Sequence, residues 1–127
     1  MNTKISGTAA FLGLITVIIG AFGAHSLKEK LDPEALQSFE TGVRYMMYHV
    51  LALLLIANAN GLSEKTKLIV SGFFFLGILF FSGSIFIITT SVVEARQIWF
   101  ITPLGGLFFI LGWLITGLSF FRSTSKN

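Results

Sequence analysis

The chain has 127 residues, of which 54% are hydrophobic and only 12% are charged, and it contains no cysteine. Soluble domains carry about 25% charged residues, and a small domain keeps too much surface to hide such an apolar excess from water. The composition therefore excludes an ordinary water-soluble domain and predicts extensive contact with lipid, while the lack of cysteine excludes disulfides and thiolate chemistry. The net charge of +3 comes from basic residues scattered in short loops, which fits membrane topology rather than nucleic-acid binding.

Four apolar stretches, taken in chain order, predict four membrane-spanning helices in a single domain that covers residues 1–127. About 20 residues cross a bilayer as a helix, and three of the stretches reach this length without a charged residue. We place the spans at approximately residues 5–24, 40–60, 68–92 and 98–121. The first stretch is long for the apolar region of a signal peptide, so we expect a retained helix.

The second span is too short unless its flanks contribute, because residues 43–57 would reach only about 22 Å across a hydrocarbon core of about 30 Å. Upstream, Asp32 can cap a helix that has Pro33 at its first position. We therefore expect a short interfacial helix at about residues 33–41 that runs into the second span, and Gly42 is a place where it could bend.

The lysines and arginines of the short loops predict the orientation, because cytoplasmic loops carry an excess of these residues. One side of a four-span arrangement holds Lys4, Lys65, Lys67, Arg122 and Lys126. The other side holds Lys28, Lys30 and Arg96, with Arg44 at the entrance of the second helix. We therefore expect both termini to be cytoplasmic.

Small side chains at helical spacing mark the expected contacts between spans, because helices in lipid associate through close packing and a few hydrogen bonds. The candidate packing residues are Thr16, Gly20 and Ala24 in the first span, Gly83 in the third, and Gly105, Gly112 and Thr116 in the fourth. The alternative interpretation is that the glycines line a pathway or let a ligand approach the backbone.

Ionisable side chains at membrane depth are costly and are functional candidates. His49 lies deepest, Tyr45 shares its helical face, and His25 ends the first span. Glu40 and Arg44 are four residues apart and could pair. If the first two helices are antiparallel neighbours, one polar cluster would gather near one membrane surface. Its members would be His25, Glu40, Arg44, Tyr45, Tyr48, His49, Ser82 and Ser84.

Several chemistries can be weighed against this cluster. Two histidines and a glutamate at the surface are too few for a zinc site, which needs three or four ligands, and no triad for serine hydrolysis is evident. We therefore assign no catalytic residue, metal or cofactor. Axial haem ligation by His25 and His49, and a proton relay through His49, Tyr45 and Glu40, stay open beside a structural interpretation, in which these groups bond to each other and to backbone carbonyls.

Four motifs carry a family resemblance: "GAFGAHSL" (20–27), "FETGVRYMMYHVLALL" (39–54), "FSGSIFIITT" (81–90) and "TPLGGLFFILGW" (102–113). Together they resemble a family of small inner-membrane proteins catalogued as a domain of unknown function, number 423, which has small transmembrane relatives in animals. The resemblance covers nearly the whole chain. It implies a four-helix integral membrane protein of the bacterial plasma membrane, and it implies no activity.

The sequence thus predicts an all-α membrane protein with four spans, surrounded by lipid and associated with itself or with a larger membrane complex. The first functional hypothesis is a non-enzymatic structural or accessory subunit of a membrane assembly. The alternative is an oligomeric transporter with a proton or solute pathway that uses His25, Glu40, Arg44 and His49. A second alternative is binding of a lipid head group, quinone or haem at the same cluster.

Overall fold

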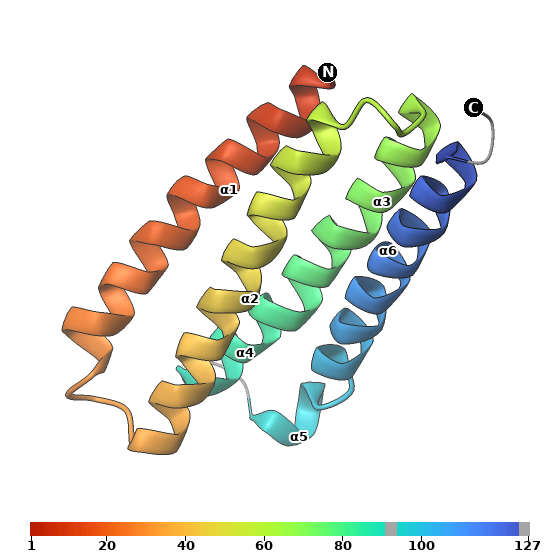
Figure 1. Ribbon diagram of the computed structural model, residues 1–127. Helices are drawn as coiled ribbons and strands as arrows, with labels where there is room; N and C mark the ends of the chain where they lie inside the picture. Colours follow the sequence, from red (N-terminus) through yellow and green to blue (C-terminus); the bar gives the residue numbers. More distant parts are fainter. Residues whose placement is uncertain (91–93, 125–127) are drawn as a thin grey trace.

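A computed structural model describes residues 1–90 and 94–124, and these ranges contain helices and turns but no strand. Four helical segments within them are long and apolar enough to cross a membrane: Thr3–Leu27, Pro33–Asn58, Glu64–Thr89 and Ile101–Ser123. Figure 1 shows the four segments side by side, with the N-terminus and the end of the last helix at the same end of the molecule. The predicted all-α, four-span fold is confirmed.

The described ranges contain eight helical elements, seven of which form the four segments. The first span is α1 (Thr3–Phe22) followed by the π-helical turn η1 (Gly23–Leu27), and the second is α2 (Pro33–Asn58). The third span consists of α3 (Glu64–Gly77), the π-helical turn η2 (Ile78–Ser82) and α4 (Gly83–Thr89). A short helix, α5 (Ala95–Ile98), precedes the fourth span, α6 (Ile101–Thr124).

Side-chain caps explain where three of the helices begin. The Asn2 side chain accepts a hydrogen bond from the Ile5 N–H at the start of α1. The Asp32 carboxylate accepts one from the Ala35 N–H at 2.8 Å, directly before Pro33, and the Ser63 hydroxyl caps α3 in the same way. Each cap satisfies a backbone donor that has no partner within its own helix.

The segment expected to form an interfacial helix, residues 33–41, is the first part of α2 and continues through Gly42 into the second span. The span ends at Asn58, near its predicted end. The third span begins at Glu64, four residues before the predicted start at 68, and the predicted end at 92 lies outside the described residues. The fourth begins at Ile101 rather than at 98.

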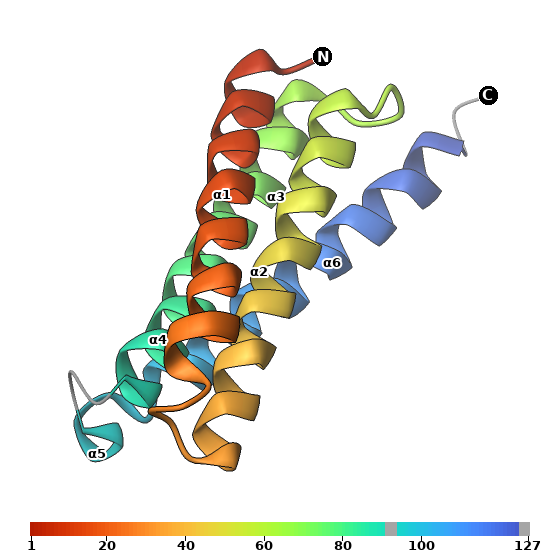
Figure 2. The same cartoon turned by 90° about the vertical axis from the view of Figure 1, so that its left-hand side faces the viewer.

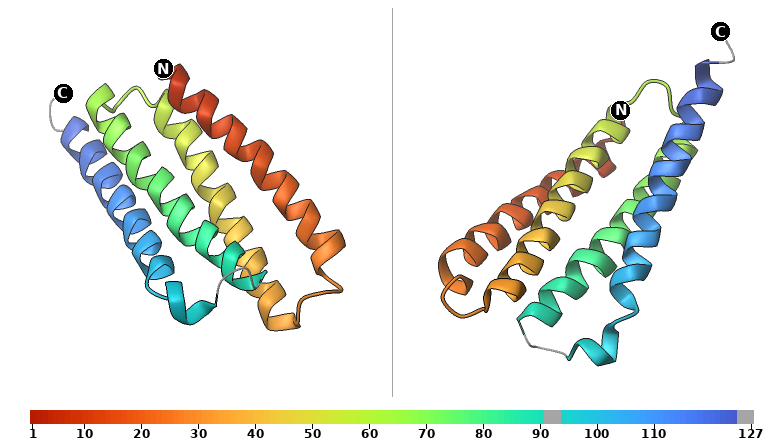
Figure 3. Two further views of the ribbon diagram at one scale, coloured as in Figure 1. Left: turned by 180° about the vertical axis from the view of Figure 1, so that it is seen from behind. Right: turned by 60° about the horizontal axis from the view of Figure 1, so that its bottom comes forward.

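Neighbouring spans pack in chain order. Helix α1 packs against α2, α2 packs against the third span, and α6 packs against α3 and η2. The side view shows α6 diverging from α1 and α2 toward the end that carries the termini (Figure 2), and the views in Figure 3 show the same order of helices from behind and from below. The buried core includes Leu53, Val70 and Phe74 from the two middle spans.

Glycine contacts establish the antiparallel register of α1 and α2. A Cβ added at Gly13 would lie 3.3 Å from Val50 Cγ1, and one added at Gly20 would lie 3.2 Å from Val43 Cγ1. The 20 residues of α1 are about 30 Å long, which matches the hydrocarbon core. The centre of the membrane therefore lies near residue 50 of α2.

Candidate functional site

The His49 side chain lies near mid-membrane in an aromatic cage. It is 4% exposed. Its ring stacks on Phe109 with 3.5 Å between centroids and an interplanar angle of 8°, and it meets Phe74 edge-on at 5.1 Å. The sequence placed His49 in a cluster near one membrane surface, but the register with α1 places it beside the middle of that helix.

Both ring nitrogens of His49 are used in hydrogen bonds. The Trp113 indole N–H donates to Nε2 at 3.0 Å, and Nδ1 lies 2.7 Å from the Tyr45 carbonyl oxygen. An indole N–H can only donate, so Nε2 is the acceptor and Nδ1 carries the proton that is donated to Tyr45. The imidazole is therefore neutral and links α2 to α6, with no nitrogen lone pair left for a haem iron or another metal.

The hydroxyls of the "SGS" motif connect the third span to its two neighbours. Ser82 Oγ donates to the Gly42 carbonyl oxygen of α2 at 2.7 Å. Ser84 Oγ donates to Phe81 O and bonds to the Thr102 hydroxyl of α6. Gly83 between them is not a close helix contact, because an added Cβ would meet only one carbonyl oxygen, at 4.0 Å. The serines, rather than this glycine, hold the helices together here.

The predicted polar cluster does not form as one group. His25 is exposed in η1, and the α1–α2 register places it level with about residue 38 of α2, about 16 Å along the axis from His49. A haem bridging the two histidines therefore does not fit. Sequence reasoning failed here because it took charged residues as markers of the membrane surface and so placed His49 too near that surface.

Glu40 and Arg44 do not form the expected ion pair. Arg44 Nη2 donates to Thr41 Oγ1 at 3.0 Å, and the ion pairs within the described ranges are Lys67–Glu64 and Arg96–Glu94. Both Glu40 and Arg44 are exposed and line a cleft of about 200 Å³ between α1 and α2, with Gly20, Gly23 and Ala24 on its other wall. Arg44 can extend its charged end toward the membrane surface while its stem stays in lipid.

Tyr45 and Tyr48 project from the surface of α2, with ring centroids 5.9 Å apart. Tyr45 packs on Phe81 of η2 at 4.9 Å and borders a groove of about 480 Å³ between α2, η2 and α6. The groove is lined by Tyr45, His49, Phe81, Gly106, Phe109, Ile110 and Trp113. It lies on the lipid-facing side of the protein, since Tyr45 is 41% and Trp113 50% exposed.

The other predicted packing residues lie at helix contacts or bond within their own helices. A Cβ added at Gly105 would lie 2.7 Å from Phe81 Cα, so α6 touches the backbone of η2 there, while Gly112 lies against the Phe74 ring. The buried Thr16 and Thr116 donate to carbonyls of their own helices.

A hydrogen-bonded network that sequence reasoning missed joins three spans at the end that carries the termini. Glu64 accepts from Asn2 Nδ2 at 3.0 Å and from Lys67 Nζ at 2.9 Å, and the Asn2 N–H donates to the Ala57 carbonyl. Lys67, interpreted from sequence as part of a solvated loop, is only 4% exposed. Ser63 followed by Glu64 is the signal that could have placed these residues in a helix.

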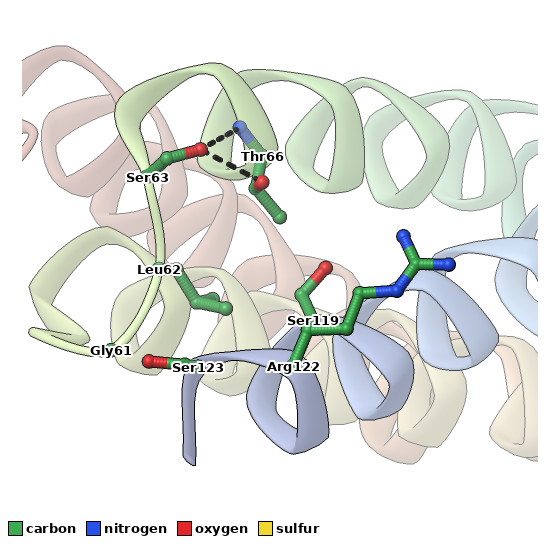
Figure 4. A pocket seen from close by; sticks show the side chains of 7 residues that line it. All are labelled: Gly61, Leu62, Ser63, Thr66, Ser119, Arg122 and Ser123. Atoms are coloured by element: carbon green, nitrogen blue, oxygen red, sulfur yellow. Dashed lines mark hydrogen bonds between the residues drawn. The ribbon is translucent and has the colours of Figure 1, made fainter. Parts of the chain in front are cut away.

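A shallow polar pocket of about 320 Å³ lies at the same end, between the α2–α3 loop, α3 and α6 (Figure 4). Its lining is Gly61, Leu62, Ser63, Thr66, Ser119, Arg122 and Ser123. Ser63 Oγ bonds to both the backbone N–H and the hydroxyl of Thr66, so the two hydroxyls are already paired. The described residues contain no group of three or more histidine, aspartate or glutamate side chains placed to hold a metal ion.

Fold and interior together define a small integral membrane protein with four spans, in which polar side chains at membrane depth connect neighbouring helices. The family described as "Protein of unknown function (DUF423)" matches residues 19–106, and the chain belongs to this family. The matched region begins near the end of α1 and ends in the first turns of α6. The resemblance seen in the four motifs is thereby confirmed.

The chain is similar over most of its length to proteins named as UPF0382 membrane proteins. It is 43% identical to YwdK of Bacillus subtilis, over 84% of this chain and 86% of that protein. It is 34% identical to a Haemophilus influenzae protein, over 98% of this chain and 99% of that protein. It is 36% identical to the inner membrane protein YgdD of Escherichia coli, over 94% of this chain and 90% of that protein. No solved structure gives a significant match.

Proposed function

We propose that the protein is a non-enzymatic structural component of the bacterial plasma membrane that associates with itself or with a larger membrane assembly, with both termini in the cytoplasm. The observation that carries the proposal is that the polar residues of the motifs form hydrogen bonds between helices. His49 bonds to Trp113, Ser82 to the α2 backbone, and Ser84 to the fourth span. Groups engaged in holding helices together are not free to bind or move a substrate.

The two outer helices support association with other molecules. Only 17% of the apolar window of the first span and 22% of that of the fourth are buried within the chain, against 44% and 39% for the second and third. Large apolar side chains on α1, such as Leu14 and Ile18, are exposed. These faces must be covered by lipid or by protein.

A transport pathway is less well supported. Such a pathway needs polar groups at several depths on one accessible face, whereas His49, Ser82 and Ser84 are buried and bonded within the chain. His25 and Arg44 lie much nearer one end.

The test is association in the native membrane. A photo-crosslinking residue would replace Ile18 of α1 or Leu114 of α6, both of which are exposed. The molar mass of the extracted protein would be measured by light scattering. We expect protein adducts and a polypeptide mass above the 13.9 kDa of one chain. Lipid adducts alone at both positions, together with a single-chain mass, would overturn the proposal. Proton flux into vesicles that disappears in His49→Ala would favour the transporter instead.

A further inference from the structure

The groove between α2, η2 and α6 has the size and position of a binding site for a lipid-soluble molecule. Its volume of about 480 Å³ lies within the range of roughly 300–1,000 Å³ found for small-molecule sites. It opens sideways toward lipid, with its lining contributed by Tyr45 and His49 of α2, Phe81 of η2 and residues 106–113 of α6. A ligand would therefore enter from the bilayer rather than from water.

Aromatic rings form most of its walls. Phe81, Phe109 and Trp113 surround it, and Tyr45 closes one side against Phe81. Such walls favour a flat ring, because aromatic groups pack in stacked or edge-to-face arrangements worth more than their buried area alone. The absence of a side chain at Gly106 leaves open space beside Phe81: an added Cβ would be 3.9 Å from Phe81 Cδ2.

Among the polar groups that line the groove, the Tyr45 hydroxyl is the donor that has no partner in the described part of the chain. His49 and the Trp113 N–H satisfy each other. Within the described residues, the Tyr45 hydroxyl has no hydrogen-bond partner, although the register with α1 places its Cα inside the hydrocarbon core. A hydroxyl left without a partner in an apolar medium is costly. A ligand that fits the groove would therefore be mostly apolar and would carry one hydrogen-bond acceptor for this hydroxyl.

We propose that this groove binds the ring of a lipid-soluble quinone, with the Tyr45 phenol donating a hydrogen bond to a ring carbonyl oxygen. A quinone combines a flat ring, carbonyl acceptors and an apolar tail, which match the aromatic walls, the free phenol and the opening to lipid. A plain acyl chain would fill the volume but would leave the phenol unpaired. The proposal concerns binding, goes beyond the structural role proposed above, and can stand or fall independently of it.

The experiment measures binding of decylubiquinone to the purified protein in lipid nanodiscs. The chain contains two tryptophans, so a Trp99→Phe background leaves Trp113, at the groove, as the reporter of fluorescence quenching. We expect saturable quenching. Tyr45→Phe should weaken binding by about fivefold, the effect of losing one hydrogen bond, whereas Tyr48→Phe, which alters the neighbouring exposed tyrosine outside the groove, should leave the affinity unchanged.

A second pair of variants tests the space itself. Gly106→Leu should abolish saturable quenching by filling the groove, and Gly117→Leu is the matched control on the same helix, where an added Cβ meets nothing within 4 Å. Circular dichroism checks folding, and Ile110→Phe, which enlarges the side chain at the exposed side of the groove without adding a tryptophan, replaces Gly106→Leu if that variant fails to fold.

The proposal would be overturned by quenching that never saturates, by equal affinity in Tyr45→Phe and the parent protein, or by equal affinity in the groove-filling variant. Decylbenzene, which has the tail and a ring without carbonyls, serves as the competitor. If it displaces decylubiquinone at equal concentration, the groove holds any apolar chain and the assignment to a quinone is wrong.

Discussion

Replacing Gly105 by alanine should destabilise the protein, although alanine is the better helix former. The added Cβ would lie 2.7 Å from Phe81 Cα and 2.8 Å from the Phe80 carbonyl carbon. Carbon atoms pack at about 3.5–4.0 Å, so α6 and η2 would have to separate by about 1 Å. The obstacle is backbone, which cannot turn aside as a side chain can.

The magnitude follows from two opposing effects. Overpacking costs about 1–3 kcal/mol, and a backbone obstacle places this substitution near the upper end. The gain in helix propensity from glycine to alanine is about 1 kcal/mol. We expect a net loss of about 2 kcal/mol in the free energy of unfolding for Gly105→Ala.

The neighbouring glycine is the control. At Gly106 an added Cβ meets only Phe81 Cδ2, at 3.9 Å, which is an ordinary contact. Gly106→Ala should therefore keep the propensity gain and raise stability by up to about 1 kcal/mol. The assay is reversible unfolding by SDS in mixed micelles, followed by circular dichroism. A Gly105→Ala protein as stable as Gly106→Ala would refute the close approach of α6 to η2.

Three further predictions concern residues placed by the structure. Trp113→Phe and His49→Ala, combined in a double-mutant cycle under the same unfolding assay, should show a coupling between about 0.6 kcal/mol, the average for hydrogen bonds within a membrane protein, and about 1.7 kcal/mol, the largest value; additive effects would mean that the bond does not form. Lys67→Met should leave stability within about 1 kcal/mol, because the carboxylate left without its ion-pair partner, Glu64, is exposed and keeps its bond to Asn2; a loss of several kcal/mol would show that the ion pair is essential. Because the chain has no cysteine, Lys28→Cys should react with an impermeant maleimide on intact cells and Lys65→Cys only after lysis, and the opposite pattern would invert the proposed orientation.

Local signals in the sequence were sufficient for the number of spans and for one helix start. The apolar stretches depend on composition alone, and the Asp32 cap followed by Pro33 involves adjacent residues. The stretch from 33 to 41 was harder, because its amphipathic pattern suits both an interfacial helix and the entrance of a span. The structure shows one continuous helix.

The contacts of the candidate site depend on the register between distant helices, which one sequence does not specify. His49 and Trp113 are 64 residues apart, and each alone could be interpreted as a residue at a membrane boundary. Their pairing requires α6 to meet α2 at the right height, and the close approach at Gly105, which fixes α6 against η2, is likewise a contact between segments distant in sequence. Lys67 was misplaced for a related reason, since nothing in its local sequence shows that three spans converge around it.

The turn η2 shifts by one residue the sequence positions of the third span that face inward. The buried Lys67 and Phe74 of α3 are seven residues apart, and so are the buried Ser82, the last residue of η2, and Thr89 at the end of α4. From Phe74 in α3 to Ser82 at the end of η2, the separation is eight residues. The wide turn thus absorbs one residue, and removing a residue from 78–82 would rotate the two halves of the span relative to each other by about 100°. Ser82 would then turn away from Gly42, so the length of this segment matters as much as its composition.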